Sequence, residues 1–125
     1  ALYKEFYAAL LMDTIDVPSP DCFHREAGES YASHSTRMFA ATERALEQHS
    51  EQVCAVIVEP LVQCAGNMRM YDPVYLRLLR EACDRYNVHL IAAEIAVGFV
   101  RTGTLFACAQ AGIDPSGGGS GNRQR

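Results

Sequence analysis

Several features that would place this chain in a broad class are missing from its sequence. It has no block of basic residues and a formal net charge of −4, so a phosphate-neutralising nucleic-acid surface is not expected. The longest apolar run, 53–58, is too short to cross a bilayer, and no signal peptide pattern opens the chain. The sequence therefore predicts neither a nucleic-acid-binding nor a membrane protein.

Cysteine occurs five times but never as a CxxC pair. An odd number of widely spaced cysteines is typical of buried thiols in a reducing compartment rather than of a disulfide framework. A cluster of Cys22, His24 and His34 lacks the spacing of a metal site. We therefore expect structural thiols, no metal and a cytoplasmic location. The cysteines are Cys22, Cys54, Cys64, Cys83 and Cys108.

The composition is that of one folded domain with a different tail. Of the 125 residues, 49% are hydrophobic and 21% are charged, which argues against a disordered polymer. The tail, 114–125, reads DPSGGGSGNRQR, and nothing helical follows its glycines as a phosphate-binding loop requires. A linker, vector scar or frame-shifted end is therefore favoured, and we assign residues 1–113 to the domain. Because the first residue is Ala1, we expect the natural start upstream.

The first half of the chain predicts two helices separated by a strand. Apolar spacing indicates an amphipathic helix over 2–11, and alternation indicates a strand over 13–17. Prolines and turn formers then fill the connection 18–30. Ser33 or Ser35 is expected to cap a second helix. Its apolar side carries Met38, Phe39, Ala41, Ala45 and Leu46.

The second half predicts a repeated strand and helix pattern. The β-branched run 53–58 favours a strand that is buried on both faces. Further elements follow: a loop 61–72 turning at Gly66, a helix from Pro73 to Asn87, a strand 88–91 and a helical segment 104–111. The order indicates an α/β layer with parallel pairing of the later strands. Glu59 and residues 93–95 should then lie side by side at the carboxyl edge of the sheet.

Two motifs at these strand ends resemble those of a known family. Residues 59–68 match the pattern EP-x-x-Q-x-x-G-x-M, and residues 90–103 read LIAAEIAVGFVRTG. These resemble the EP-x-x-Q-x-x-G-x-M and LIADEI-x-x-GFGRTG stretches of class III (fold-type I) pyridoxal-phosphate aminotransferases, closest to those of the biotin pathway. The resemblance covers 1–113. It implies a partial large domain of the aspartate aminotransferase-like fold, with mainly parallel strands and flanking helices.

The resemblance assigns three cofactor-binding positions. In the family, the acid of the DE pair holds the protonated pyridine nitrogen, which keeps the cofactor ring an electron sink. Ala93 stands at that position and has no acid. Ile95 matches the aliphatic residue that packs on the ring, or is an ordinary core isoleucine. Glu59 matches a glutamate near the cofactor and the substrate carboxylate, or is a polar strand end.

Neighbouring motif positions have different expected roles. Glu94 should point to the face opposite Ala93, so it cannot replace the missing acid. Val100 replaces a motif glycine, and a β-branched residue is strained there if the family backbone has a positive φ. Arg101 and Thr102 retain the rest of the motif in a structural turn.

The sequence offers no catalytic residue. Transamination needs a lysine amine to hold the cofactor, and the single lysine is Lys4, a solvated residue of the first predicted helix. When this sequence is aligned with the family's motif without gaps, Asn122 falls near the position of the family's lysine.

Three hypotheses result. The resemblance implies a parent enzyme that is a homodimer and moves an amino group from S-adenosylmethionine to 8-amino-7-oxononanoate, while this chain itself is expected to be inactive. The alternative is a non-catalytic remnant or engineered fragment that self-associates through exposed edges. An independent flavodoxin-like domain has only the α/β pattern in its favour.

Overall fold

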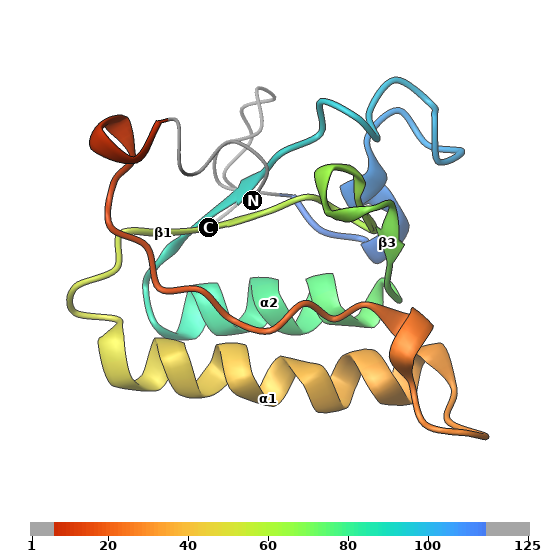
Figure 1. The fold of residues 1–125 in the computed structure, drawn as a ribbon, viewed down its shortest axis with the longest axis horizontal. Coiled ribbons are helices and arrows are strands. Elements are labelled where there is room, and N and C mark those ends of the chain that lie inside the picture. Colours follow the sequence, from red (N-terminus) through yellow and green to blue (C-terminus); the bar gives the residue numbers. More distant parts are fainter. Residues whose placement is uncertain (1–6, 115–125) are drawn as a thin grey trace.

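Two helices cover one face of a pair of parallel strands in the computed structural model, which describes residues 7–114. Strands β1 (Ala55–Val58) and β4 (His89–Ala92) lie side by side. Helix α2 (Val74–Arg85) packs on β4, and α1 (Tyr31–His49) packs on α2. Figure 1 shows both helices on the same side of the strands. The predicted α/β class, with parallel strands and flanking helices, is confirmed.

Helix α1 begins where a serine satisfies a free backbone amide. The Ser30 hydroxyl accepts a hydrogen bond from the Ser33 N–H at 3.1 Å, which is the usual contact of an N-terminal cap. The predicted caps, Ser33 and Ser35, are therefore wrong. Ser35 is buried instead, and its hydroxyl accepts a bond from the Asp72 N–H at 3.1 Å. The sequence offered three similar serines, and contacts with a distant segment determine their roles.

The interface between the helices is built around Tyr75. Its ring meets Phe39 of α1 edge to face, with 5.6 Å between ring centroids, and its hydroxyl lies 2.7 Å from the Thr42 hydroxyl. This arrangement buries a large aromatic side chain and also gives its polar end a partner. The side of α2 that faces the core carries the buried residues Tyr75, Leu76, Leu79, Ala82 and Cys83.

Both ends of α2 follow from local sequence. At the start, Pro73 is the N-terminal cap residue, and the Asp72 carboxylate accepts a bond from the Val74 N–H at 2.9 Å. At the end, Asn87 has a left-handed φ of 55°, a conformation that asparagine accepts more readily than most residues. The predicted start and stop of this helix are confirmed.

The strand pair is covered on one face only. Parallel register places Val56 beside Leu90 and Ile57 beside Ile91. Leu90 is buried and Val56 packs on the core, whereas Ile57 is 68% exposed. The prediction that 53–58 is buried on both faces is therefore wrong, because in the described residues helices pack against only one side of the pair.

The predicted loop 61–72 contains a small antiparallel hairpin. Strands β2 (Val62–Gln63) and β3 (Arg69–Met70) pair with each other. Gly66 is not the turning point as predicted, since the left-handed residues are Asn67, with φ of 69°, and Met68, with φ of 57°. Gly66 instead ends a short 3-10 turn.

Several shorter predicted elements are absent or reduced. Residues 13–17 form no strand, because no neighbouring strand supplies hydrogen bonds to them. The described part of the predicted helix 2–11 holds only a 3-10 turn at Ala8–Leu10, and residues 1–6 lie outside the described residues. The segment 104–111 is helical only as a 3-10 turn, η4 (Ala107–Ala111). The tail from residue 115 also lies outside the described residues, so its boundary stays a prediction.

All five cysteines are free. Cys22, Cys83 and Cys108 are buried as expected, whereas Cys54 is exposed. No helix within the described part of the chain is long and apolar enough to cross a membrane.

Replacing Leu79 by alanine should destabilise the fold by about 2–5 kcal/mol, because its side chain is only 1% exposed in the helix–strand core. Urea unfolding followed by circular dichroism measures this change. The control is Leu10→Ala, since Leu10 is 81% exposed and should leave the free energy of unfolding nearly unchanged. Equal effects of the two substitutions would contradict the described core.

Candidate cofactor-facing strand ends

The carboxyl ends of β1 and β4 lie next to each other. The register pairs Val58 with Ala92, and the Ala93 N–H donates to the Val58 carbonyl at 2.8 Å. This bond continues the ladder one residue beyond the strands. Glu59 and Ala93 therefore follow adjacent strand ends, which confirms that they lie side by side.

Tyr71 holds the backbone at the end of β1. Its hydroxyl donates to the Glu59 carbonyl at 2.7 Å, and its own N–H donates to the Leu61 carbonyl at 3.1 Å. Burial raises the pKa of the Tyr71 phenol, so the proton needed for this hydrogen bond stays in place. Leu61 has a φ of 63°, so the chain turns sharply here. The sequence did not predict this hydrogen bond of Tyr71, because its partner lies twelve residues away.

The three predicted cofactor positions are partly or fully open to solvent. Glu59 and Ala93 are half-buried, and Ile95 is 100% exposed. The alternative that Ile95 is an ordinary core isoleucine is therefore wrong. Ala93 contributes only a methyl group to this edge of the sheet, so the position carries no charge and no hydrogen-bonding side chain.

Glu94 has both carboxylate oxygens engaged by backbone amides. One oxygen accepts from the Ala107 N–H at 2.8 Å and the other from the Cys108 N–H at 3.0 Å. The carboxylate therefore lies at the start of η4. That Glu94 points to the face opposite Ala93 stays a prediction.

The motif turn after β4 is strained. Phe99 and Val100 have φ values of 54° and 67°, in the left-handed region that β-branched residues accept poorly. Val100 therefore meets the condition under which strain was expected at this position, since its own φ is positive. The Gly103 N–H donates to the Val100 carbonyl at 3.0 Å, and Gln110 donates to the Thr102 carbonyl, so this motif forms a structural turn as predicted.

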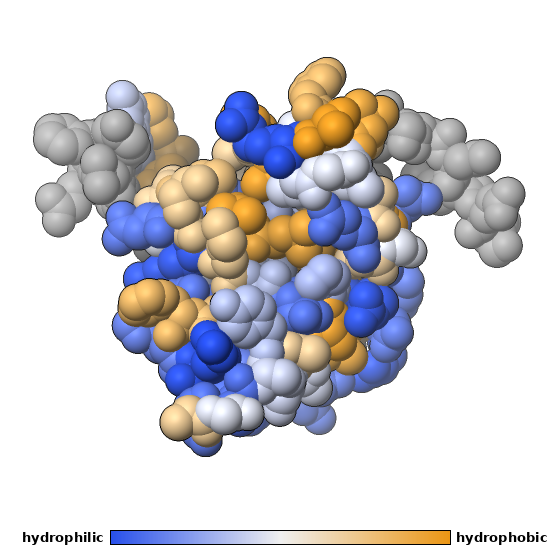
Figure 2. Space-filling model, turned by 90° about the vertical axis from the view of Figure 1, so that its right-hand side faces the viewer, coloured by the Kyte–Doolittle hydropathy of each residue, from blue (hydrophilic) through white to orange (hydrophobic). Residues whose placement is uncertain are grey.

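Apolar side chains are exposed on the same loop. Figure 2 shows hydrophobic residues gathered at the upper part of the end that carries the loop after β4. The exposed large residues there are Phe99, Val100, Leu105 and Phe106.

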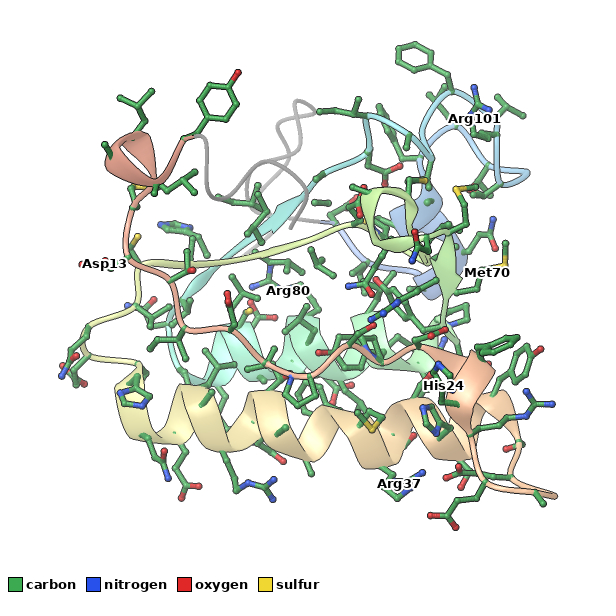
Figure 3. All side chains as sticks on the ribbon, in the orientation of Figure 1. Asp13, His24, Arg37, Met70, Arg80 and Arg101 are labelled. Carbon is green, nitrogen blue, oxygen red and sulfur yellow. The ribbon has the colours of Figure 1, made fainter. Side chains whose placement is uncertain are left out.

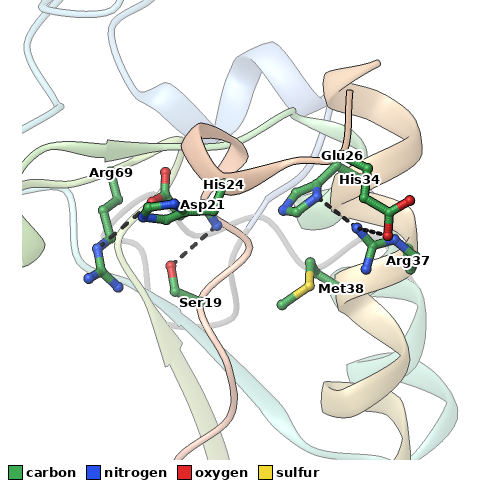
Figure 4. Close-up of a pocket in the computed structure, with 8 residues that line it drawn as sticks. All are labelled: Ser19, Asp21, His24, Glu26, His34, Arg37, Met38 and Arg69. Carbon is green, nitrogen blue, oxygen red and sulfur yellow. Dashed lines mark hydrogen bonds and ion pairs between the residues drawn. The ribbon is translucent and has the colours of Figure 1, made fainter. Parts of the chain in front are cut away.

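A separate polar pocket of about 370 Å³ lies between the 19–26 segment, α1 and Arg69 (Figure 4). Beside it, the Glu29 carboxylate binds Arg37 through two contacts of 3.0 and 2.9 Å and approaches His34 Nδ1 at 3.1 Å. His34 Nε2 is buried and has no hydrogen-bond partner among the described residues. Figure 3 shows Arg37 well apart from Arg101 of the loop after β4, and neither Glu59 nor Ala93 lines this pocket.

No group of three potential metal ligands occurs among residues 7–114. The pocket cluster was not predicted from the sequence. Glu29 and Arg37 lie on either side of the start of α1, and their spacing alone does not show that they meet.

The fold and the strand-end motifs define part of an α/β domain of the kind found in aminotransferases. The family model for aminotransferase class III matches residues 1–116. The chain therefore belongs to the class III aminotransferase family.

Individual relatives agree with this assignment. The adenosylmethionine-8-amino-7-oxononanoate aminotransferase of Nitratidesulfovibrio vulgaris is 40% identical over 115 residues, covering 92% of this chain. The same enzyme of Helicobacter pylori is 41% identical over 114 residues, covering 91%. The chain spans only 21% and 24% of the length of these two relatives.

Solved structures give the same fold. The omega transaminase of Pseudomonas jessenii in complex with PMP superimposes with a TM-score of 0.68 at 32% identity, covering 79% of this chain and 22% of that one. An omega-aminotransferase from Paracoccus denitrificans gives a TM-score of 0.73 at 23% identity, covering 90% of this chain and 25% of that one. The second likeness supports the fold alone.

The family depends on pyridoxal phosphate, and the strand ends do not fit this cofactor fully. Ala93 has no group that can hold a proton on a pyridine nitrogen. The neighbouring acid, Glu94, already binds two backbone amides. The only lysine of the sequence, Lys4, and the tail residue Asn122 lie outside the described residues.

Replacing Val100 by glycine should stabilise the fold by about 1 kcal/mol, because glycine adopts a φ of 67° without steric strain. Thermal and urea unfolding of the two proteins measure the difference. As a control, Val17→Gly in the exposed segment 13–17 should be neutral or destabilising, since Val17 is not among the left-handed residues. Destabilisation by Val100→Gly would argue against the strained turn.

The Glu29 cluster should make stability depend on pH in acid. Hydrogen bonds from Arg37, above all, lower the pKa of Glu29 from 4.5 to about 2. Its contribution is therefore fully present above about pH 4.5 and is lost as the pH falls toward 2. Glu29→Gln should flatten the stability profile over this range, as measured by urea unfolding at successive pH values. Glu47→Gln, on the exposed side of α1, should keep the parental profile.

Proposed function

We propose that this chain is a segment of the cofactor-binding domain of an aminotransferase of the biotin pathway. The parent protein would use pyridoxal phosphate and move an amino group from S-adenosylmethionine to 8-amino-7-oxononanoate, acting as a homodimer. The support comes from the two strand-end motifs and from relatives whose names state this reaction. We further propose that this polypeptide does not catalyse the reaction by itself.

The observation that carries the inactivity is the alanine at position 93. It follows β4 directly and is bonded to the end of β1, the place where the family resemblance puts an acid. Without a carboxylate there, a bound cofactor ring would lose the partner that keeps its nitrogen protonated. Glu59 and Ile95 remain the proposed contacts on the same edge. The alanine at position 93 adds to the lack of a lysine that could anchor the cofactor.

A second candidate function is self-association without catalysis. Ile57, Ile95 and Phe99 are large apolar residues with exposed fractions of 68%, 100% and 86%. Exposed apolar surface of this kind favours association between protein surfaces. The free thiols support the proposal of a reducing, cytoplasmic location.

Binding of pyridoxal phosphate tests the assignment of position 93. Ala93→Asp should bind the cofactor about tenfold more tightly than Ala93→Asn, because only the carboxylate pairs with a protonated ring nitrogen. Absorbance titration measures the affinity, and borohydride treatment followed by peptide mapping locates any lysine adduct. We expect a weak adduct at Lys4 only. No variant should transfer amino groups from S-adenosylmethionine to 8-amino-7-oxononanoate.

Three results would contradict the proposal. Equal affinities of the Asp and Asn variants would remove position 93 from the cofactor site. A saturable, site-specific adduct of the parent chain would show that it retains a working anchor. Turnover by the parent chain would overturn the inactivity. Sedimentation velocity on the same samples tests the second candidate, which predicts oligomers that grow with concentration.

A further inference from the structure

The carboxylate of Glu94 connects two points of the chain that are more than ten residues apart. Its oxygens accept hydrogen bonds from Ala107 and Cys108, at the start of η4. These amides begin a helical turn, so their N–H groups have no partner within it. The carboxylate takes the place of an N-terminal cap, since Phe106, at the cap position, makes no side-chain hydrogen bond to η4.

The backbone of Glu94 fixes the other side of the same loop. Its carbonyl accepts from the Gly98 N–H at 2.8 Å and from the Val97 N–H at 3.3 Å. A Cβ atom at Gly98 would lie 2.9 Å from this carbonyl oxygen, so glycine is required for the close approach. Glu94 therefore holds both the beginning and the end of the segment 95–106.

The preceding residue is fixed separately. Ala93 donates its N–H to the Val58 carbonyl, so the ladder of the strand pair ends one residue before Glu94. Positions 93 and 95, which carry the cofactor assignments, thus flank the residue that holds the loop. Burial and the adjacent Glu94 carboxylate also raise the pKa of the Cys108 thiol to about 12, consistent with a charged group at this contact.

We propose that Glu94 is a positioning residue whose carboxylate ties the start of η4 to the end of β4, thereby setting the course of the chain through positions 93 and 95. The two acids of the family's DE motif would then have different tasks, with the first facing the ring and the second holding the loop. The task of the first acid, facing the ring, rests on the proposed function. The tie itself is a property of this chain without any cofactor.

Hydrogen exchange of the cofactor-free protein tests the tie directly. Glu94→Ala should raise exchange of the Ala107 and Cys108 amides about tenfold or more, because both lose their acceptor. Glu94→Gln keeps one acceptor oxygen and should give an intermediate rate at one of the two amides. Peptides of α2 should exchange as in the parent. Glu47→Ala, an exposed glutamate of α1, should leave Ala107 and Cys108 unchanged.

The outcomes are distinguishable from those of the cofactor test. Unchanged exchange at Ala107 and Cys108 in Glu94→Ala would overturn the proposal, as would an equal rise throughout the chain in Glu94→Gln. If Glu94→Ala does not fold, the glutamine variant provides the decisive comparison at the same two amides. Failure of cofactor binding has no bearing on these rates, since no cofactor is present in the experiment.

Discussion

The backbone hydrogen bond from Ala93 to the carbonyl of Val58 is the contact on which the candidate site depends. It extends the parallel ladder beyond the paired strands and brings Glu59 next to Ala93. Parallel strands need a connection that returns along the sheet, and α2 supplies it while covering one face of the pair. The location of the motif residues therefore depends on the register of the strands and on the packing of α2 against them.

The two faces of the strand pair place different packing constraints on their side chains. On the helical face, Leu76, Leu79 and Leu90 are almost fully buried, and packing there tolerates little change. On the opposite side Ile57 and Ile95 are exposed, so the fold does not depend on their packing. The residues assigned to the cofactor lie at the edge of the sheet, where the core places few demands on side-chain chemistry. A methyl group at position 93 is compatible with the fold for this reason.

Family membership and chemical competence are separate properties of this chain. Similarity to class III aminotransferases follows from a long pattern of apolar residues, turns and motif positions, which together determine an α/β layer. Electron withdrawal by a cofactor ring depends on a single acid at one position. Loss of that acid leaves the pattern intact, and function has to be argued from the site and not from the fold.

The sequence by itself predicted the elements that arise from local periodicity. Helix α2 and its stop at Asn87 follow from residue types within a few turns of chain. It also showed directly that position 93 holds no acid. These features need no knowledge of distant contacts.

Only the tertiary structure decided the features that depend on which segments meet. Ser30 rather than Ser33 or Ser35 caps α1, because Ser35 is needed at the Asp72 amide. The alternation in 13–17 produced no strand, since no neighbour was available to pair with it. The partners of Glu94 lie more than ten residues along the chain. In each case several arrangements satisfy the local rules equally well, and the energy of non-local contacts selects one of them.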